Sequence, residues 1–187
     1  MIGGPPAGDL VFAPPCPEWL GDYADALRRG WSPNNLRDVG SEQLAAIAAD
    51  PEAFLASLTA QSGTIRLADG QEVPRLPNRV LWLWDGAFCG VIGLRWQDGT
   101  DALPPYVTGH VGYAIVPWKR RRGYATAALR TILPVAREVG LTEIEITADS
   151  TNTASLRIIE KCGGRLAGER GKGHAPGSRH LVYRIPT

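Results

Sequence analysis

The spacing of apolar residues in the first third of the chain predicts helices. Apolar side chains recur at helical intervals between residues 17 and 30, and Gly30 suits the end of that helix. Residues 41–61 predict one or two more helices, with Ser41 as a cap and Pro51 as the start of a second helix. The opening residues are rich in Gly and Pro, which is typical of a loop or a short edge strand.

The middle of the chain changes to runs that are typical of strands joined by tight turns. Residues 64–76 predict a hairpin across Asp69-Gly70. The runs RVLWLWDG and AFCGVIGLRWQDG follow, and a second Asp-Gly turn at residues 85–86 joins them. A third run, YVTGHVGYAIV, ends at Val116. These segments predict an antiparallel meander.

The last part of the chain alternates between the two kinds of pattern. An amphipathic helix is predicted from about residue 123 to 139, although Pro134 should kink or split it. TEIEITAD alternates as a strand, residues 152–162 predict a helix, and RHLVYRI predicts a closing strand. A Gly-rich loop, residues 168–180, is expected to join the last two strands. Together these elements predict an α/β or α+β sheet with helices on its faces.

The composition narrows the class of protein. A chain of 187 residues with 44% hydrophobic residues predicts one domain with a real core. Its 20 Lys and Arg nearly balance its 19 Asp and Glu, which disfavours a protein built mainly to coat nucleic acid. The 3 cysteines are far apart and form no CxxC motif, so neither a disulfide framework nor a metal site is expected. No run is long enough to span a membrane, and the first residues lack the basic-then-apolar order of a signal peptide, so a cytoplasmic location is expected.

The stretch with the clearest chemistry is GYAIVPWKRRRGYATAALR, residues 112–130. A predicted strand ends at a proline, four bases follow at residues 119–122, and Gly123 opens the predicted helix. The first N–H groups of a helix have no partner inside the helix, so such a start can hold phosphate. The basic run taken alone is more typical of a solvated loop. A nucleic-acid patch is a third interpretation, which the balanced net charge disfavours.

Two segments together resemble the GNAT N-acetyltransferase superfamily. VGYAIVPWKRRRGYATAAL resembles its acetyl-CoA pyrophosphate loop, Arg/Gln-x-x-Gly-x-Gly/Ala, and ADSTNTASLRIIEKCGG resembles its second cofactor segment. GQEVPRLPNRVLWLWDGAFCGVIGLRW is similar to a group of predicted bacterial acetyltransferases in that superfamily. The strong resemblance covers about residues 80–164. It implies a mixed, mostly antiparallel central sheet with helices on both faces, and acetyl-CoA as co-substrate.

The resemblance also implies which residues hold acetyl-CoA. Ile115 and Val116 would offer backbone groups to the pantetheine arm. Asn152 and Ser155 would lie beside the pantetheine or adenosine side. Arg121 stands where many members have Gly, but contacts there are made by the backbone. The pyrophosphate cradle, formed mostly by main-chain N–H groups, would comprise Arg120 in the motif's Arg/Gln position and then Arg121, Arg122, Gly123, Tyr124, Ala125 and Thr126.

The sequence offers few candidates for the general acid and general base of this reaction. The attacking amine must lose a proton and the leaving thiolate must gain one. Ile159 stands at the position of the family's usual acid, a Tyr, and cannot give a proton. His110 and Tyr113 are the candidate catalytic groups, although alternation places them on opposite strand faces unless a bulge intervenes. The alternatives are a structural His110, a packing Tyr113 and a proton relayed by water. The N–H of Val116 or its neighbour is the candidate donor to the thioester carbonyl.

Two functions fit these observations. The first is an N-acetyltransferase that moves acetyl from acetyl-CoA to a primary amine of a small molecule or a peptide. The second is an acyl-CoA-binding or sensor module of the same fold with impaired catalysis, which Ile159 suggests. Either would be one domain, with an acceptor-side part at residues 1–79, an acetyl-CoA-binding core at 80–164 and C-terminal strands at 165–187. A monomer or homodimer is expected, with no nucleic-acid or membrane partner.

Overall fold

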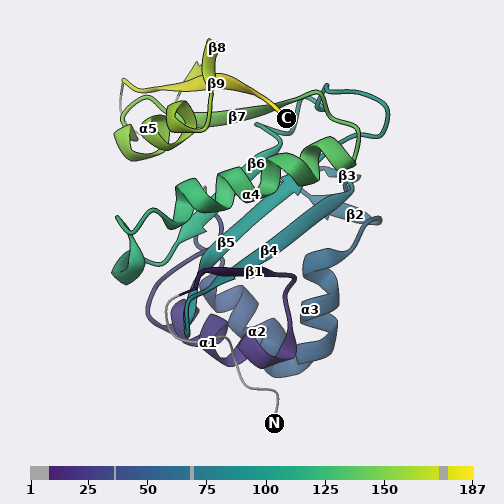
Figure 1. Ribbon diagram of the computed structural model, residues 1–187. Coiled ribbons are helices and arrows are strands. Elements are labelled where there is room, and N and C mark those ends of the chain that lie inside the picture. The colour runs from purple at the N-terminus through teal and green to yellow at the C-terminus, as the bar shows by residue number, and fades with distance from the viewer. Residues whose placement is uncertain (1–8, 36, 68–69, 173–176) are drawn as a thin grey trace. The chain divides into compact units, whose positions relative to one another are not determined.

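The helices and strands of the computed structural model follow the order that the sequence predicts (Figure 1). The structure describes residues 9–35, 37–67, 70–172 and 177–187. The helices are α1 (Pro17–Arg28), α2 (Gly40–Ala49), α3 (Pro51–Thr59), α4 (Tyr124–Glu138) and α5 (Thr153–Lys161), with a 3₁₀ turn η1 (Pro117–Lys119). The strands are β1 (Val11–Ala13), β2 (Thr64–Arg66), β3 (Glu72–Pro74), β4 (Asn78–Trp84), β5 (Phe88–Arg95), β6 (Val111–Ile115), β7 (Glu143–Asp149), β8 (Arg165–Lys172) and β9 (Arg179–Pro186).

Helices α2 and α3 confirm that residues 41–61 form two helices, and Pro51 starts the second as predicted. The prediction that Ser41 caps α2 is wrong. That helix already begins at Gly40, whose N–H donates a hydrogen bond of 2.8 Å to the carboxylate of Asp38. The acidic side chain before the helix therefore does the work expected of the serine hydroxyl.

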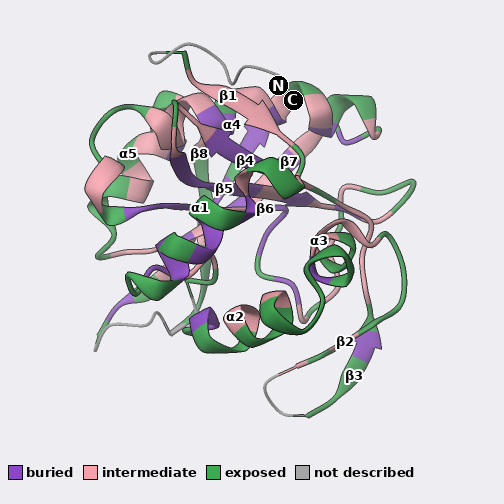
Figure 2. Cartoon of the chain, turned by 90° about the horizontal axis from the view of Figure 1, so that it is seen from below, coloured by how far each residue is buried: buried purple, intermediate pink, exposed green. Residues whose placement is uncertain are grey.

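Two compact units make up the chain, Met1–Gly93 with Tyr113–Tyr124, and Leu94–Gly112 with Ala125–Thr187. An aromatic core holds the first unit together. Tyr23 of α1 stacks on Trp82 of β4 with ring centroids 4.6 Å apart, and both side chains are buried. Figure 2 shows buried residues along α1 and mostly exposed residues on α2. Burial of such large aromatic rings stabilises the packing of α1 on the sheet.

One sheet contains β1, β4, β5 and β6 in that order, and β2 pairs with β3 as the predicted hairpin. The N–H of Val116 donates to the carbonyl of Cys89 at 3.0 Å. Further along the same pair of strands, the N–H of Arg95 donates to the carbonyl of His110 at 2.9 Å. Both bonds correspond to the same register, so the strand gains no net bulge between residues 110 and 116.

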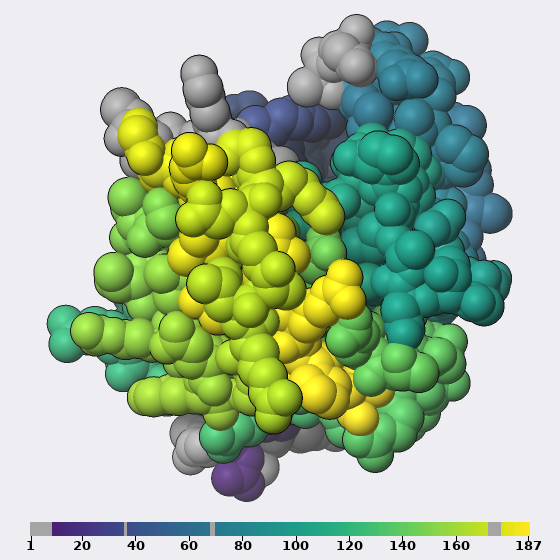
Figure 3. Space-filling view, turned by 90° about the horizontal axis from the view of Figure 1, so that it is seen from above, coloured from purple at the N-terminus to yellow at the C-terminus, as the bar shows by residue number. Residues whose placement is uncertain are grey.

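The second unit contains a sheet in the order β7, β9, β8, and Figure 3 shows β8 and β9 side by side. Strand β8 continues to Lys172, so the Gly-rich loop predicted from residue 168 begins later than expected. The strand accommodates its glycines by register shifts at Leu166/Gly168 and Arg170/Lys172. Residues 173–176 of the predicted loop lie outside the described residues.

Helix α4 runs through Pro134 as one element, so the predicted split is wrong. Pro134 is exposed, whereas Ala128, Leu129 and Ile132 on the predicted apolar stripe are fully buried. A proline removes one intrahelical hydrogen bond. Packing of the apolar stripe outweighs that loss, because tertiary contacts supply most of a helix's stability in a protein.

Candidate functional site

The end of β6 carries the first predicted cofactor contacts. Ile115 and Val116 are both buried. The prediction that the N–H of Val116 polarises the thioester is wrong, because this N–H already donates to Cys89 within the sheet. Pro117 has no N–H, so the remaining neighbour is Ile115. Backbone groups alternate in direction along a strand, and the N–H of Ile115 therefore points away from β5, at the outer edge of the last strand in the sheet.

Two of the four bases in the following turn hold the turn together. The ammonium of Lys119 pairs with the carboxylate of Asp85, and each side chain is only 12% exposed. The Nε of Arg120 donates to the carbonyl of Ile115 at 3.2 Å, which closes the turn onto the end of β6. The next two bases, residues 121–122, are exposed. In this basic run, Lys119 and Arg120 therefore hold the turn in place, whereas the side chains of residues 121–122 are exposed to solvent.

Asp85 supports this turn, and sequence reasoning missed it. It lies between β4 and β5, where its only visible signal was an Asp-Gly turn. One carboxylate oxygen pairs with Lys119, and the other accepts a hydrogen bond of 2.5 Å from the hydroxyl of Tyr124, the first residue of α4. Burial alone would raise the pKa of Asp85, but the hydrogen bonds from Lys119 and Tyr124 outweigh it and lower the pKa to about 2. The carboxylate therefore stays charged and fixes the start of α4.

The turn itself is shaped to present backbone N–H groups. Arg121 and Gly123 both have left-handed backbone conformations, with φ of 63° and 83°. Successive N–H groups in such turns form concave anion sites. No described residue accepts a hydrogen bond from the N–H groups of residues 121–123, and a Cβ on Gly123 would meet nothing within 4 Å. Free donors, open space and the start of α4 together fit a pyrophosphate.

The backbone conformation of Arg121 shows how an arginine can stand where the family pattern has Gly. An L-residue at φ 63° costs about 1 kcal/mol relative to the right-handed region, which a Gly would avoid. The resemblance implies Gly at this position in many members, and the backbone conformation here is the one that Gly favours. The side chain of Arg121 is exposed and its N–H remains free, so the position keeps its backbone role.

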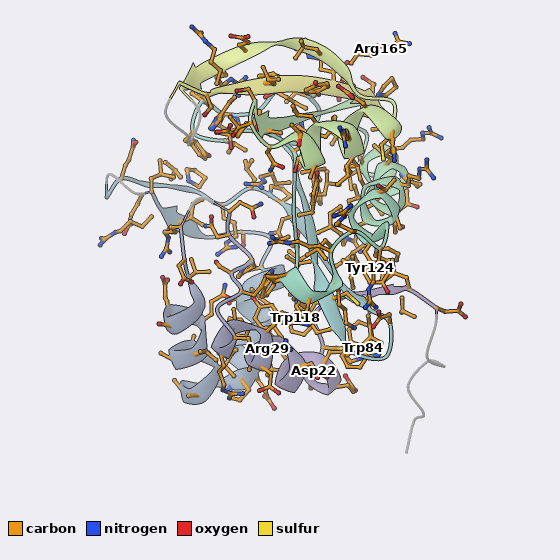
Figure 4. All side chains as sticks on the ribbon, turned by 90° about the vertical axis from the view of Figure 1, so that its left-hand side faces the viewer. Asp22, Arg29, Trp84, Trp118, Tyr124 and Arg165 are labelled. Atoms are coloured by element: carbon orange, nitrogen blue, oxygen red, sulfur yellow. The ribbon has the colours of Figure 1, made fainter. Side chains whose placement is uncertain are left out.

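An aromatic contact connects the turn to α1 within the first unit. The guanidinium of Arg29 lies 3.4 Å from the ring centroid of Trp118 in η1, and Figure 4 shows these two side chains close together. Trp118 is partly buried against the aromatic core of this unit. A cation over an indole face contributes about 0.5–1 kcal/mol at a partly exposed site. The contact adds a second anchor for the turn.

Asn152 caps α5. Its side-chain oxygen accepts a hydrogen bond of 3.1 Å from the N–H of Ser155. Asn152 is exposed and Ser155 is partly buried. An N-cap satisfies one of the free N–H groups at a helix start. The predicted contacts of these two residues with acetyl-CoA stay predictions.

His110 is held by the backbone of β7. Its Nδ1 accepts a hydrogen bond of 2.9 Å from the N–H of Glu145, and its own N–H donates to the carbonyl of Glu145 at 2.7 Å. The residue is 1% exposed, and burial lowers the pKa of the imidazole, which is therefore neutral. This pairing also explains why β6 starts only at Val111, later than predicted. The geometry favours the structural alternative for His110.

Tyr113 occupies the outer edge of β6. Its carbonyl accepts a hydrogen bond of 3.1 Å from the side-chain amide of Asn35, which lies between α1 and α2. The constant register of the strand keeps Tyr113 and His110 on opposite faces. The structure therefore does not bring the two candidate catalytic groups together.

Ile159 is a core residue. It is 0% exposed, and a Cβ at Gly164 would lie 2.4 Å from its Cγ2. Gly164 is thus required for the close approach of the chain to this side chain. A buried isoleucine side chain therefore occupies the position of the family's usual acid.

Comparison with known proteins places the chain in a family. The model of the acetyltransferase (GNAT) domain matches residues 35–165, more than half of the chain, which therefore belongs to the GNAT acetyltransferases. Acetyl-CoA is the co-substrate of these enzymes, and similar proteins have been solved with it. No curated protein matches the chain.

Several solved structures share the fold. RimJ of Mycobacterium smegmatis in complex with CoA-disulfide is 19% identical, with a TM-score of 0.68 over 97% of this chain and 84% of that one. The microcin C7 self-immunity acetyltransferase MccE, in complex with acetyl-CoA and AMP, is 12% identical, with a TM-score of 0.65 over 98% of both chains. YncA from Salmonella typhimurium with acetyl-CoA is 16% identical, with a TM-score of 0.54 over 95% and 93%. Likeness at these identities establishes the fold.

The described residues offer few other chemical sites. None of their His, Cys, Asp and Glu side chains gather in groups of three or more that could hold a metal ion. No helix among the described residues combines the length and apolar character that a membrane crossing requires. Cys16, Cys89 and Cys162 are all free thiols.

Proposed function

We propose that this protein transfers acetyl from acetyl-CoA to a primary amine of a small molecule or a peptide. The observation that carries the proposal is the turn at residues 121–123, whose free N–H groups and left-handed backbone lead directly into α4. Ile115 and Val116 line the strand end before this turn, as the family pattern requires. Arg122, Gly123, Ala125 and Thr126 complete the proposed cradle.

The chemistry proposed for this chain uses backbone groups for polarisation. The amine nitrogen attacks the thioester carbon, the C–N bond forms, the C–S bond breaks and the sulfur takes up a proton. The N–H of Ile115 stabilises the oxyanion, because it points to the outer edge of β6. Water carries the amine proton. Ile159 gives no proton, so the thiolate is protonated by solvent.

A charge reversal in the cradle tests the proposal. Gly123→Glu places a carboxylate where the pyrophosphate would bind, so acetyl-CoA affinity measured by calorimetry should fall at least tenfold. Gly140→Glu is a matched control, because Gly140 has φ of 88°, also has nothing within 4 Å, and lies beyond the other end of α4. Equal losses in both variants, or no loss in Gly123→Glu, would contradict the cradle.

The role of His110 is separable from its packing. In His110→Asn, the amide oxygen can replace Nδ1 as acceptor for the Glu145 N–H, whereas no group replaces the imidazole as a base. We expect His110→Asn to keep kcat within about threefold, because the proton relay does not use His110. His110→Ala should lose about 2 kcal/mol of stability, since the Glu145 N–H is then unpaired. A loss of kcat of a hundredfold or more in a stable His110→Asn would make His110 the base.

A second function is favoured by Ile159. A buried isoleucine in the acid position suits a protein that binds acyl-CoA without efficient turnover. A screen of primary amines for release of free CoA separates the two functions. Turnover supports the enzyme, and tight acetyl-CoA binding without turnover across the panel supports the sensor. A cytoplasmic location and the monomer or homodimer stay predictions.

A further inference from the structure

Arg95 is a charged side chain without a charged partner. It ends β5 and is only partly exposed. Its guanidinium makes no ion pair and no hydrogen bond with any side chain or carbonyl of the described residues, and burial lowers its pKa. A guanidinium carries five N–H donors in a planar fork, and a cation that loses water without gaining a partner destabilises the fold.

The guanidinium of Arg95 lies over a glycine of the neighbouring strand. Its Nη2 lies 3.2 Å from the position that a Cβ on Gly112 would occupy, so the guanidinium reaches along β6 where a side chain is missing. The N–H of Arg95 pairs with the carbonyl of His110, which places the two side chains on one face of the sheet. His110 Nε2 is buried and has no hydrogen-bond partner, although His110 is 1% exposed.

The nearest acids of this unit are engaged elsewhere. Glu145 pairs with Arg170 at 3.0 Å. Asp101 accepts a hydrogen bond of 2.9 Å from the N–H of Thr142. His110 Nε2 forms no hydrogen bond in the described part of the chain, and neither does Glu145 Oε1, which lies in an ion pair with Arg170. The Arg95 fork and His110 Nε2 are thus two donors on one face to which no acceptor is hydrogen-bonded. Unused buried donors of this kind are uncommon unless a ligand supplies the acceptor.

We propose that Arg95 binds an anionic group, a carboxylate or a phosphate, carried by the acceptor amine, with His110 Nε2–H as a second donor. The inference rests on the proposed acetyl transfer. Gly112 immediately precedes Tyr113 on β6, and Ile115 follows two residues later on the same strand. The planar fork of Arg95 matches both anions in a bidentate manner, so the site selects acceptors by their charge.

Pairs of amines that differ only in the anionic group test this site. We would compare an amino acid with its primary amide, and phosphoethanolamine with ethanolamine, by kcat/KM from release of free CoA. The first pair reports on a carboxylate and the second on a phosphate. Wild type should prefer the anionic member of at least one pair tenfold or more. Arg95→Gln should reduce that preference by on the order of ten- to a hundredfold. Gly112→Ala, whose methyl meets the guanidinium, should reduce it in part.

A stability measurement separates binding from a structural role. Arg95→Gln removes an unpaired charge, so its melting temperature should equal or exceed that of wild type. Arg79→Gln is the control, because Arg79 is an exposed arginine on β4, and it should change neither preference nor stability. An unchanged preference in Arg95→Gln, or no preference in wild type, would overturn the site, as would a lower melting temperature with the preference intact.

Failure of the proposed acetyl transfer can be told apart from failure of the anion site. If no amine releases CoA, the proposed acetyl transfer fails. The anion site is then judged by calorimetric titration of the same four compounds into the protein with CoA present. Binding of an anionic member that is lost in Arg95→Gln supports the site. Equal binding of both members of each pair, or no binding, overturns it.

Discussion

The molecule holds two sets of partly buried charges, and their partners differ. In the first unit, Asp85 pairs with Lys119 and accepts from the hydroxyl of Tyr124. In the second unit, Arg95 forms no ion pair with any described residue, and His110 Nε2 has no hydrogen-bond partner among them. The same folding rules apply to both sets. A complete set of partners indicates a role in architecture, whereas an incomplete set indicates that a ligand supplies what is missing.

The largest expected loss of stability comes from removing the carboxylate of Asp85, which is paired with Lys119. Asp85→Asn leaves Lys119 as a largely buried cation without a charged partner, so the free energy of unfolding should fall by about 2–3 kcal/mol. Urea denaturation measures the change. Asp25→Asn is the control, since the pair of Asp25 with Arg28 is 67% and 62% exposed. It should cost less than about 0.5 kcal/mol. Similar losses in both variants would show that the largely buried pair contributes no more to stability than the exposed pair.

The pH dependence of stability should report the same carboxylate. The pKa of Asp85 in the folded protein is lowered to about 2, below its value in the unfolded chain. Its contribution is therefore fully present above about pH 4 and is lost as the pH falls toward 2. Thermal unfolding between pH 2 and 5 should show a steeper slope for wild type than for Asp85→Asn. Parallel slopes would show that Asp85 does not titrate in this range.

Removing the hydroxyl of Tyr124 should have a smaller effect. Tyr124→Phe deletes one hydrogen bond but leaves the pair between Asp85 and Lys119, so we expect a loss of about 1 kcal/mol by urea denaturation. The affinity for acetyl-CoA should fall more than stability alone explains, because this bond fixes the first residue of α4. An unchanged affinity would separate the carboxylate cluster from the cradle.

The smallest effect concerns backbone rather than charge. Arg121→Gly relieves the left-handed conformation at φ 63° but adds freedom to the unfolded chain. The balance should be a gain of about 0.5 kcal/mol, measured by thermal unfolding. Acetyl-CoA affinity should change by less than about threefold, because the proposed contact is made by the N–H. A large loss of affinity would instead assign the binding to the arginine side chain.

Periodicity predicted the elements of this fold well because it reflects burial along one helix or strand. The pairing of β2 with β3, the Asp85-Gly86 turn and the restart at Pro51 follow from local preferences. The other predicted Asp-Gly turn includes residue 69, which lies outside the described residues. The family resemblance predicted a pyrophosphate cradle at residues 120–126, which stays a prediction. The structure adds that Arg121 and Gly123 of this segment have left-handed backbone conformations. What the sequence could not reveal were partners that are distant along the chain.

Asp85 shows why those partners stayed hidden. It looks like an ordinary turn residue, and its contact with Lys119 joins residues 34 positions apart. His110 looked like a base until its bond to the backbone of Glu145 was placed, and Val116 looked like a donor until the sheet used its N–H. A side chain's role depends on which groups remain unpaired after folding, and spacing does not encode that.

The link through Asp85 has a consequence for protein engineering. The turn that we propose as the pyrophosphate cradle cannot be transferred alone, because Asp85, in the hairpin between β4 and β5, contacts Lys119 and Tyr124 of this segment. A designer who grafts residues 117–126 into another scaffold must transplant that hairpin as well. Conversely, an insertion in the hairpin would alter donor recognition while leaving every residue of the turn unchanged.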